Sequence, residues 1–176
     1  MRFLLVRHPE AAIATGICYG RLDIRLRGDA MDTANEIVST IAGSGAVQVW
    51  SSPATRCLVV AETAARALGA NLLVDPRLQE LDFGAWEGVE WNSVPRASLD
   101  AWAADPIAFA PPGGESGNAL LARVRTVHQA IVATRQDCVI VSHGGPLKLL
   151  AALIRREPPD LLAPAPPLGS VQMIMG

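Results

Sequence analysis

Three short polar clusters contain the residue types that bind and transfer anionic groups. They are Arg7-His8, Ser51-Ser52 leading to Arg56, and Ser142-His143, and a carboxylate, Glu80, lies between the second and third clusters. Arginine presents planar pairs of N–H donors that match the oxygens of a phosphate dianion. A neutral imidazole can attack phosphorus and hold the phosphoryl group covalently, and a carboxylic acid can protonate the leaving alcohol. The set therefore indicates phosphoryl transfer.

Each cluster follows an apolar segment that is typical of a buried strand. The runs at 3–6, 46–50 and 138–141 are short and continuous, as strands of parallel sheets are, and two further strands are predicted at 71–74 and 171–175. Apolar residues at helical spacing, with capping and stop signals, predict helices between these strands. They span about 29–41, 53–68, a long segment after the Gly113-Gly114-Glu115-Ser116 turn, and 147–154.

The alternation of strands and helices predicts an α/β fold, a three-layer α/β/α sandwich with a mostly parallel central sheet. In such sheets ligands bind beyond the carboxyl ends of the strands. We therefore expect His8, Arg56 and His143 to meet at one edge of the sheet, although they lie far apart in the sequence.

The length of the chain predicts one domain spanning residues 1–176. Residues 77–115 are less regular, rich in Gly and Pro, and hold three of the four tryptophans. We interpret this segment as an inserted lid or wall with short helices. Tryptophans are more often core than ligand platforms, but Trp86 and Trp102 are candidates to overhang the site.

Composition excludes several function classes. The formal net charge is −2 and no segment is strongly basic, which predicts no binding to nucleic acid. No uncharged apolar stretch approaches the roughly 20 residues of a membrane span. The three cysteines show no metal-ligand spacing and are expected to be free thiols in a reducing cytoplasm. We expect no metal and no cofactor, a small phosphate monoester as partner, and a monomer or homodimer.

At this point a family resemblance can be stated. Five motifs stand in the order typical of the histidine phosphatase superfamily, the phosphoglycerate mutase-like proteins, and cover residues 2–154. They are Arg7-His8-Pro9, Ser51-Ser52-Pro53-Ala54-Thr55-Arg56, Leu78-Gln79-Glu80 followed by Gly84 and Trp86-Glu87-Gly88, Gly113-Gly114-Glu115-Ser116, and Ser142-His143-Gly144. The sequence resembles this superfamily throughout that span.

The resemblance implies roles for particular residues. It makes His8 the phosphorylated nucleophile, Glu80 the acid and base, and Arg7, Arg56 and His143 the clamp on the phosphoryl oxygens. It also implies substrate contacts from Tyr19-Gly20 and from the backbone of Gly144. Arg21 is a further candidate for a substrate contact, with a salt bridge to Asp23 as the alternative. Asp82 and Glu87 are rivals of Glu80, and we expect Ser51 and Ser52 to act mainly as helix caps.

The sequence departs from the family pattern near the nucleophile. Pro9 replaces the usual Gly and removes an N–H close to the phosphate. Ala14 stands where relatives often carry a substrate-contacting Asn, and Val60 replaces a frequent Thr. None of the five catalytic positions is changed, so these departures bear on the substrate and the rate.

Within the superfamily the chain looks most like the α-ribazole phosphatases, which act on α-ribazole 5′-phosphate in cobalamin synthesis. The alternatives are a broad-specificity phosphatase, a phosphoglycerate mutase-type phosphotransferase, a phosphatase of phosphohistidine proteins, and a non-catalytic protein that binds phosphorylated ligands. The third histidine, His128, flanks the buried stripe of the long helix, and we expect it to have a packing or surface role.

Overall fold

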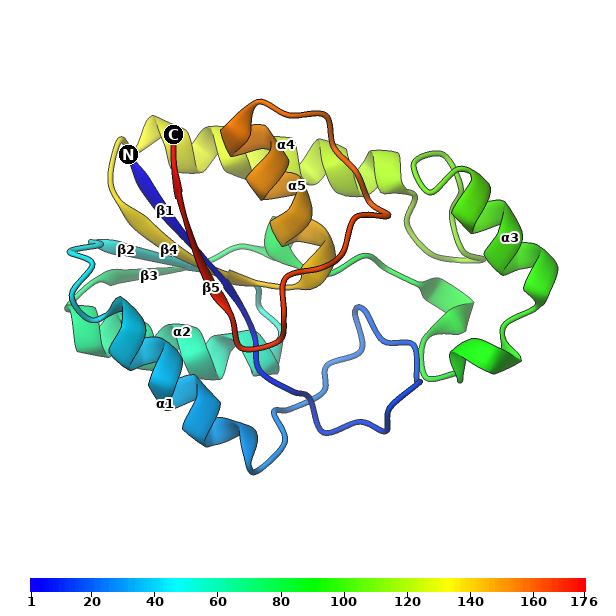
Figure 1. Cartoon of the computed structure of the whole chain (residues 1–176), viewed down its shortest axis with the longest axis horizontal. Coiled ribbons are helices and arrows are strands. Elements are labelled where there is room, and N and C mark those ends of the chain that lie inside the picture. Colours follow the sequence, from blue (N-terminus) through cyan, green and yellow to red (C-terminus); the bar gives the residue numbers. More distant parts are fainter.

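The computed structural model describes residues 1–176 and contains a five-stranded sheet with helices on both faces (Figure 1). The strands are β1 (Arg2–Arg7), β2 (Gln48–Ser51), β3 (Asn71–Val74), β4 (Cys138–Ser142) and β5 (Val171–Met175). Their order in the sheet is β3-β2-β4-β1-β5. The first four run parallel, and β5 pairs antiparallel with β1 at one edge. This confirms the predicted α/β class with a mostly parallel sheet.

Two pairs of helices cover the sheet. The helices α1 (Ala30–Ile41) and α2 (Thr55–Leu68) pack on one face, and α4 (Gly117–Ala133) and α5 (Gly144–Arg155) pack on the other (Figure 1). Strand β1 serves both layers because successive side chains of a strand point to opposite faces. Its Phe3 and Leu5 join the core under α4 and α5, whereas Leu4 and Val6 join the core under α1 and α2.

The central strand β4 is buried along its whole length, which explains its continuous apolar sequence. The stripe predicted for the long helix is present, because Leu120, Val124, Val127 and Ile131 of α4 are all fully buried. None of the helices is both long enough and apolar enough to cross a membrane.

Two helix starts differ from the sequence prediction. Helix α2 begins at Thr55, after Pro53, and neither Ser51 nor Ser52 caps it. Its first turn is instead tied down by Asp23, whose carboxylate accepts hydrogen bonds from the Thr55 amide at 2.7 Å and the Thr55 hydroxyl at 2.6 Å. Helix α5 begins at Gly144, three residues before the predicted start, so its N-terminus directly follows His143.

Short helices joined by irregular loops make up the segment 77–115. It contains the short 3₁₀ helices Gly84–Trp86 and Trp91–Ser93 and the helix α3 (Arg96–Ala104), and a third 3₁₀ helix, Pro76–Leu78, leads into it. Its apolar side chains form a small cluster around Cys18, Trp86 and Val94. The expectation that Trp86 overhangs the site is wrong, because Trp86 is buried in that cluster and stacks against Phe109.

Candidate active site

Strand register brings the first and third polar clusters together. Strands β1 and β4 are neighbours with Arg7 opposite Ser142, and the amide of His8 donates to the carbonyl of Ser142 at 3.2 Å. His8 follows Arg7 and His143 follows Ser142, and the two imidazole rings lie edge to face with their centroids 5.1 Å apart. Strand β2 lies on the other side of β4 and delivers Ser52, whose amide donates to Val141.

The imidazole of His8 is held in one tautomer. Its Nδ1 lies 2.7 Å from the carbonyl oxygen of Pro9, and a carbonyl can only accept, so Nδ1 carries the proton. Burial, with the charges of Arg56 and Arg7, lowers the pKa of His8 to about 3, against the opposing effect of the Pro9 hydrogen bond. The ring is therefore neutral at neutral pH, with the lone pair on Nε2. Pro9, which lacks an N–H, supplies the oxygen that fixes this tautomer.

Arg56 is a fully buried cation beside both histidines. It donates to the carbonyls of Gly20 at 2.6 Å and Leu22 at 2.8 Å, and its Nε lies 3.4 Å from Nε2 of His8. No carboxylate forms an ion pair with it. An unpaired buried charge is costly, so this position favours an anionic ligand.

His143 is neutral and occupied by protein partners. Its Nδ1 accepts from Nη2 of Arg56 at 3.2 Å, because a guanidinium can only donate. Its Nε2 therefore carries the proton and donates to the hydroxyl of Ser52 at 2.8 Å. Burial first, and then the charge of Arg56, lowers the pKa of His143 well below its ordinary value. Ser52, predicted as a cap, instead orients this ring.

Arg7 has a donor without a partner. Its Nη1 donates to the carbonyl of Pro166 at 2.6 Å, whereas its Nε is the one buried side-chain nitrogen or oxygen in the chain that lacks a hydrogen bond. The guanidinium lies against Gly144, where a Cβ would come within 3.4 Å of Arg7 Cζ. Unsatisfied buried donors are rare in folded proteins, and a phosphoryl oxygen would complete this one.

The carboxylate of Glu80 lies at the N-terminus of α5. Its Oε2 accepts from the amide of Gly145 at 3.2 Å, and its Oε1 accepts from the amide of Leu81 at 2.9 Å. The two alternative carboxylates, Asp82 and Glu87, accept hydrogen bonds from other backbone amides. Glu87 accepts from the amides of Arg21, Leu22 and Phe83, and Asp82 accepts from the amide of Gly84. Among the three, Glu80 is the carboxylate that shares a cavity with Arg7.

The loop after His8 closes over Arg56. The Tyr19 ring lies 5.3 Å from Arg56 Cζ, which is a cation–π distance, and the Gly20 carbonyl accepts from Arg56. A Cβ at Gly20 would overlap the carbonyl of Leu81. The salt bridge between Arg21 and Asp23, one of the two alternatives for Arg21, does not form, because Arg21 pairs with Glu115 at 3.5 Å and Asp23 binds Thr55.

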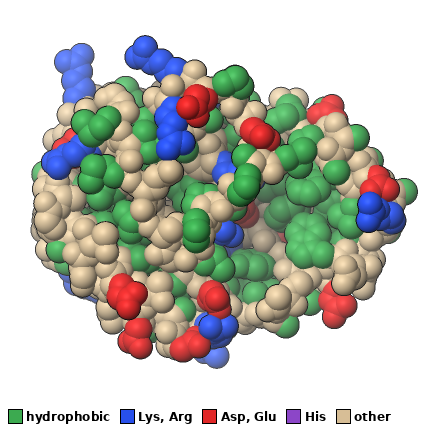
Figure 2. Space-filling model, in the orientation of Figure 1, with side chains coloured by type: hydrophobic (Ala, Val, Ile, Leu, Met, Phe, Trp, Pro, Cys, Tyr) green, Lys and Arg blue, Asp and Glu red, His purple; other side chains and the backbone are tan.

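A cavity of about 180 Å³ adjoins Arg7 and Glu80. Its polar wall includes Arg7, Glu80 and Lys148, and its apolar wall includes Phe83 and Trp102 from the inserted segment; Leu81, Leu120, Gly144, Gly145, Leu161 and Ala165 complete the lining. The space-filling view shows a hollow in the middle of this face, with hydrophobic side chains gathered on the side of α3 (Figure 2).

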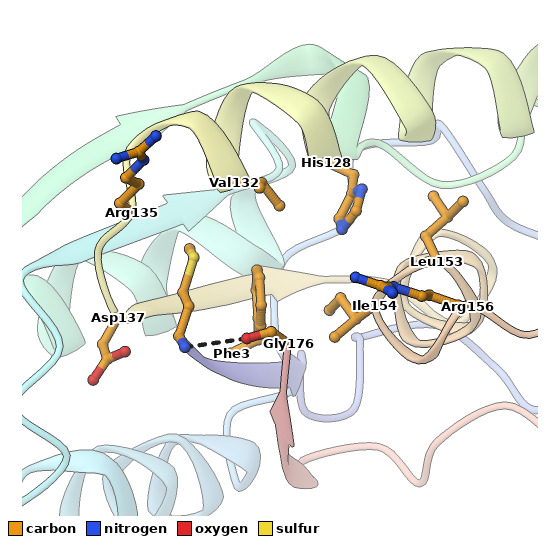
Figure 3. A pocket seen from close by; sticks show the side chains of 10 residues that line it. Phe3, His128, Val132, Arg135, Asp137, Leu153, Ile154, Arg156 and Gly176 are labelled. Atoms are coloured by element: carbon orange, nitrogen blue, oxygen red, sulfur yellow. Dashed lines mark hydrogen bonds between the residues drawn. The ribbon is translucent and has the colours of Figure 1, made fainter.

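A larger cavity, of about 520 Å³, lies at the opposite end of the sheet (Figure 3). It is lined by Phe3, His128 and Ile154 among others, with Arg135 and Arg156 just beyond the ends of α4 and α5. Helix C-termini carry partial negative charge, which these arginines offset. None of the predicted site residues reaches it, and His128 tilts against Phe3 as a packing residue.

Sequence reasoning missed some residues of the site. Lys148 interrupts the apolar run of α5, and a half-buried lysine in such a run is a signal for a local polar role. Arg123 of α4 gave no signal, because its partners come from a distant segment.

The comparisons with known proteins bear on the family. The model of the histidine phosphatase superfamily (branch 1) matches residues 3–173. The chain belongs to this superfamily. This match confirms the resemblance that the five motifs indicated. Members of the superfamily act on small phosphorylated substrates as phosphatases or mutases.

Similar proteins in the superfamily differ in the substrate that their names give. A bifunctional protein of Mycobacterium tuberculosis is 34% identical over 159 residues, covering 86% of this chain, and the chain spans only 43% of that relative. The structure of a mycobacterial glucosyl-3-phosphoglycerate phosphatase matches with a TM-score of 0.79 at 27% identity, covering 89% of this chain and 80% of that one. The α-ribazole phosphatase of Shigella flexneri matches with a TM-score of 0.88 at 24% identity, covering 99% and 90%, which shows the shared fold.

Proposed function

We propose that this histidine phosphatase is a phosphomonoesterase that works through a phosphohistidine on His8, with α-ribazole 5′-phosphate as its substrate. The observation that carries the proposal is the pair of buried groups at its centre. A neutral His8 presents its Nε2 lone pair next to Arg56, a fully buried cation without an ion pair. A phosphate dianion supplies the missing counter-charge and the electrophile together.

The first step transfers the phosphoryl group to the protein. The Nε2 lone pair of His8 forms a bond to phosphorus while the bond from phosphorus to the ester oxygen breaks. Protonated Glu80 gives its proton to the departing alkoxide, which leaves as the alcohol. Arg7 and Arg56 balance the charge of the transferred group, and His143 is the third proposed member of that clamp.

The second step returns the protein to its initial state. Glu80, now a carboxylate, takes a proton from a water molecule whose oxygen attacks phosphorus. The bond from phosphorus to Nε2 breaks, the electron pair returns to His8, and inorganic phosphate leaves. In this proposal residues 1–176 act as one domain, and the inserted segment 77–115 forms the wall that receives the alcohol.

The preference for α-ribazole 5′-phosphate is supported by the cavity next to Glu80. Phe83 and Trp102 give it an aromatic wall, and Leu120 and Leu161 add apolar surface. A planar apolar ring is the chemical group that such a wall favours. The benzimidazole of α-ribazole is a ring of this kind, whereas 3-phosphoglycerate has none.

Two measurements test the proposal. We expect kcat/KM for α-ribazole 5′-phosphate to exceed that for 3-phosphoglycerate by about 100-fold or more. Rapid quenching at alkaline pH should trap an acid-labile phosphoryl group on His8, which the His8→Asn variant lacks and the matched His128→Asn variant retains. Absence of the label would refute the intermediate. Equal rates on all esters would indicate broad specificity, and transfer to an organic acceptor in place of water would indicate a mutase.

A further inference from the structure

Arg123 lies outside the proposed catalytic set and forms hydrogen bonds with the segment that carries Glu80. It lies on α4, and its side chain is 14% exposed. Its Nη1 donates to the carbonyls of Arg77 at 2.7 Å and Gln79 at 2.6 Å, and its Nη2 donates to the carbonyl of Glu80 at 2.9 Å. One guanidinium therefore binds three carbonyls in the segment that carries Glu80.

The opposite edge of the guanidinium is held by a carboxylate. Glu115 accepts from Nε of Arg123 at 2.7 Å and from Nη2 at 2.8 Å. All five N–H donors of Arg123 thus have an acceptor, and only arginine offers five donors in a fixed plane. Burial raises the pKa of Glu115, but the hydrogen bond and charge of Arg123 outweigh it, so the pKa of Glu115 is lowered and the pair is ionised.

The segment that Arg123 holds has little structure of its own. Residues 79–83 follow the 3₁₀ helix Pro76–Leu78 and belong to no helix or strand. The Glu80 carboxylate is fixed only by the amides of Leu81 and Gly145. Its backbone position must therefore come from outside the segment, and Arg123 provides three hydrogen bonds for this purpose.

We propose that Arg123, with Glu115 as its counter-charge, is a positioning residue that fixes Glu80 for proton transfer to the leaving group. The inference rests on the proposed function, in which Glu80 is the acid. Arg123 itself touches neither His8 nor the phosphoryl site in the contacts of the structure. A displaced acid lowers the rate of the first transfer most for substrates whose leaving group must be protonated as it departs.

The test compares two esters of similar size, phenyl phosphate and 2,4-dinitrophenyl phosphate. Phenolate needs a proton on leaving, whereas dinitrophenolate does not. We expect Arg123→Met to lower kcat/KM for phenyl phosphate by about 100-fold and for the dinitrophenyl ester by less than about threefold. The ratio kcat/KM is used because it reports the first transfer and excludes the hydrolysis of the phosphohistidine. Arg125→Met, on the exposed face of the same helix, is the matched control and should change neither value.

Two further variants keep the test decisive if Arg123→Met folds poorly. Arg123→Lys keeps the charge with three donors, and Glu115→Gln breaks the ion pair with nearly the same shape. Both variants should lose more kcat/KM on phenyl phosphate than on the dinitrophenyl ester, by a smaller factor than Arg123→Met, and their circular dichroism should be unchanged. Equal losses on both esters, or no loss, in these variants would overturn the positioning role.

The variant Glu80→Gln separates this inference from the proposed function. It should show the leaving-group dependence itself, and the double variant Arg123→Met/Glu80→Gln should be no slower on phenyl phosphate than Glu80→Gln. If Glu80→Gln lacks the dependence, the acid assignment fails. If it shows the dependence while the Arg123 variants do not, only the positioning role fails.

Discussion

The rings of His8 and His143 lie edge to face, 5.1 Å apart between centroids, with the guanidinium of Arg56 in contact with both. Two protonated imidazoles at this distance, next to a buried cation, would repel one another strongly. The structure avoids this by keeping both rings neutral, and each ring donates its remaining proton to an oxygen, Pro9 for His8 and Ser52 for His143. The positive charge of the site therefore comes from arginine, and the Nε2 of His8 keeps its lone pair, 3.4 Å from Nε of Arg56.

This relationship predicts a dependence of stability on pH. The pKa of His8 is about 3 in the folded protein, against an ordinary value of 6.5, so the unfolded chain binds a proton below pH 6.5 that the folded protein refuses. Stability should therefore fall as pH decreases from about 6.5 toward 3. Each such histidine contributes a slope of about 1.4 kcal/mol per pH unit.

The His8→Asn variant isolates the contribution of His8. Its free energy of unfolding, measured by urea titration between pH 6 and pH 4, should vary with pH less steeply than that of the wild type, by roughly the slope of one histidine. Equal slopes in the two proteins would mean that His8 is protonated in the folded state, and the tautomer argument would then fail.

Gly145, the second residue after His143, predicts a second effect. A Cβ at Gly145 would overlap Oε1 of Glu80, whereas a Cβ at Gly43 meets nothing within 4 Å. Gly145→Ala should displace the Glu80 carboxylate and lower kcat/KM on an unactivated ester by about 10-fold or more, because proton transfer requires close positioning. Gly43→Ala is the matched control and should leave the rate unchanged. A Gly145→Ala protein with the wild-type rate would show that Glu80 can move without loss.

Local sequence patterns predicted the strands and helices that carry the site, because each of these elements is encoded by its own residues. A buried strand such as 138–141 is recognisable from its own residues, and the parallel arrangement then fixes where His143 must lie. The contacts that refine the site could not be predicted in this way. Helix α2 starts at Thr55 because Asp23, 32 residues earlier in the chain, binds that turn, and this leaves Ser52 for His143.

Predictions also failed where packing decided between equivalent residues. Trp86 and Trp102 belong to the same irregular segment and have the same chemical character, yet Trp86 fills a small core and Trp102 lines the cavity. Nothing in the neighbouring residues separates them. The choice depends on how the segment folds back on the loop around Cys18, which donates to and accepts from the backbone of Val89 and Gly88.

The position of Trp102 predicts an effect on selectivity. Trp102→Ala removes an aromatic face of the cavity and should lower kcat/KM for α-ribazole 5′-phosphate by about 3- to 10-fold, the worth of an aromatic pair. The rate on glycerol phosphate, which has no ring, should change little and serves as the internal control. If both substrates lose equally, Trp102 supports the fold of the inserted segment and does not contact the leaving group.

Lys148 and Arg7 together predict how the segment 158–167 is held. Lys148 is the only lysine of the chain, and its Nζ donates to the carbonyls of Leu161 at 2.5 Å and Ala163 at 2.9 Å. Arg7 donates to the carbonyl of Pro166 at 2.6 Å, so two cations that line the cavity attach this proline-rich segment, which forms no helix or strand. Burial lowers the pKa of Lys148, as expected for an amine enclosed by this segment.

Lys148→Met should therefore loosen the segment 158–167 and leave two carbonyls without their donor. Unsatisfied groups of this kind cost about 1–3 kcal/mol, and the loss should appear in the free energy of unfolding and as faster proteolysis within the segment. Arg155→Met, which removes an exposed cation from the same helix, is the matched control. If the segment 158–167 is cleaved at the same rate in Lys148→Met and in the wild type, Lys148 does not hold it in place.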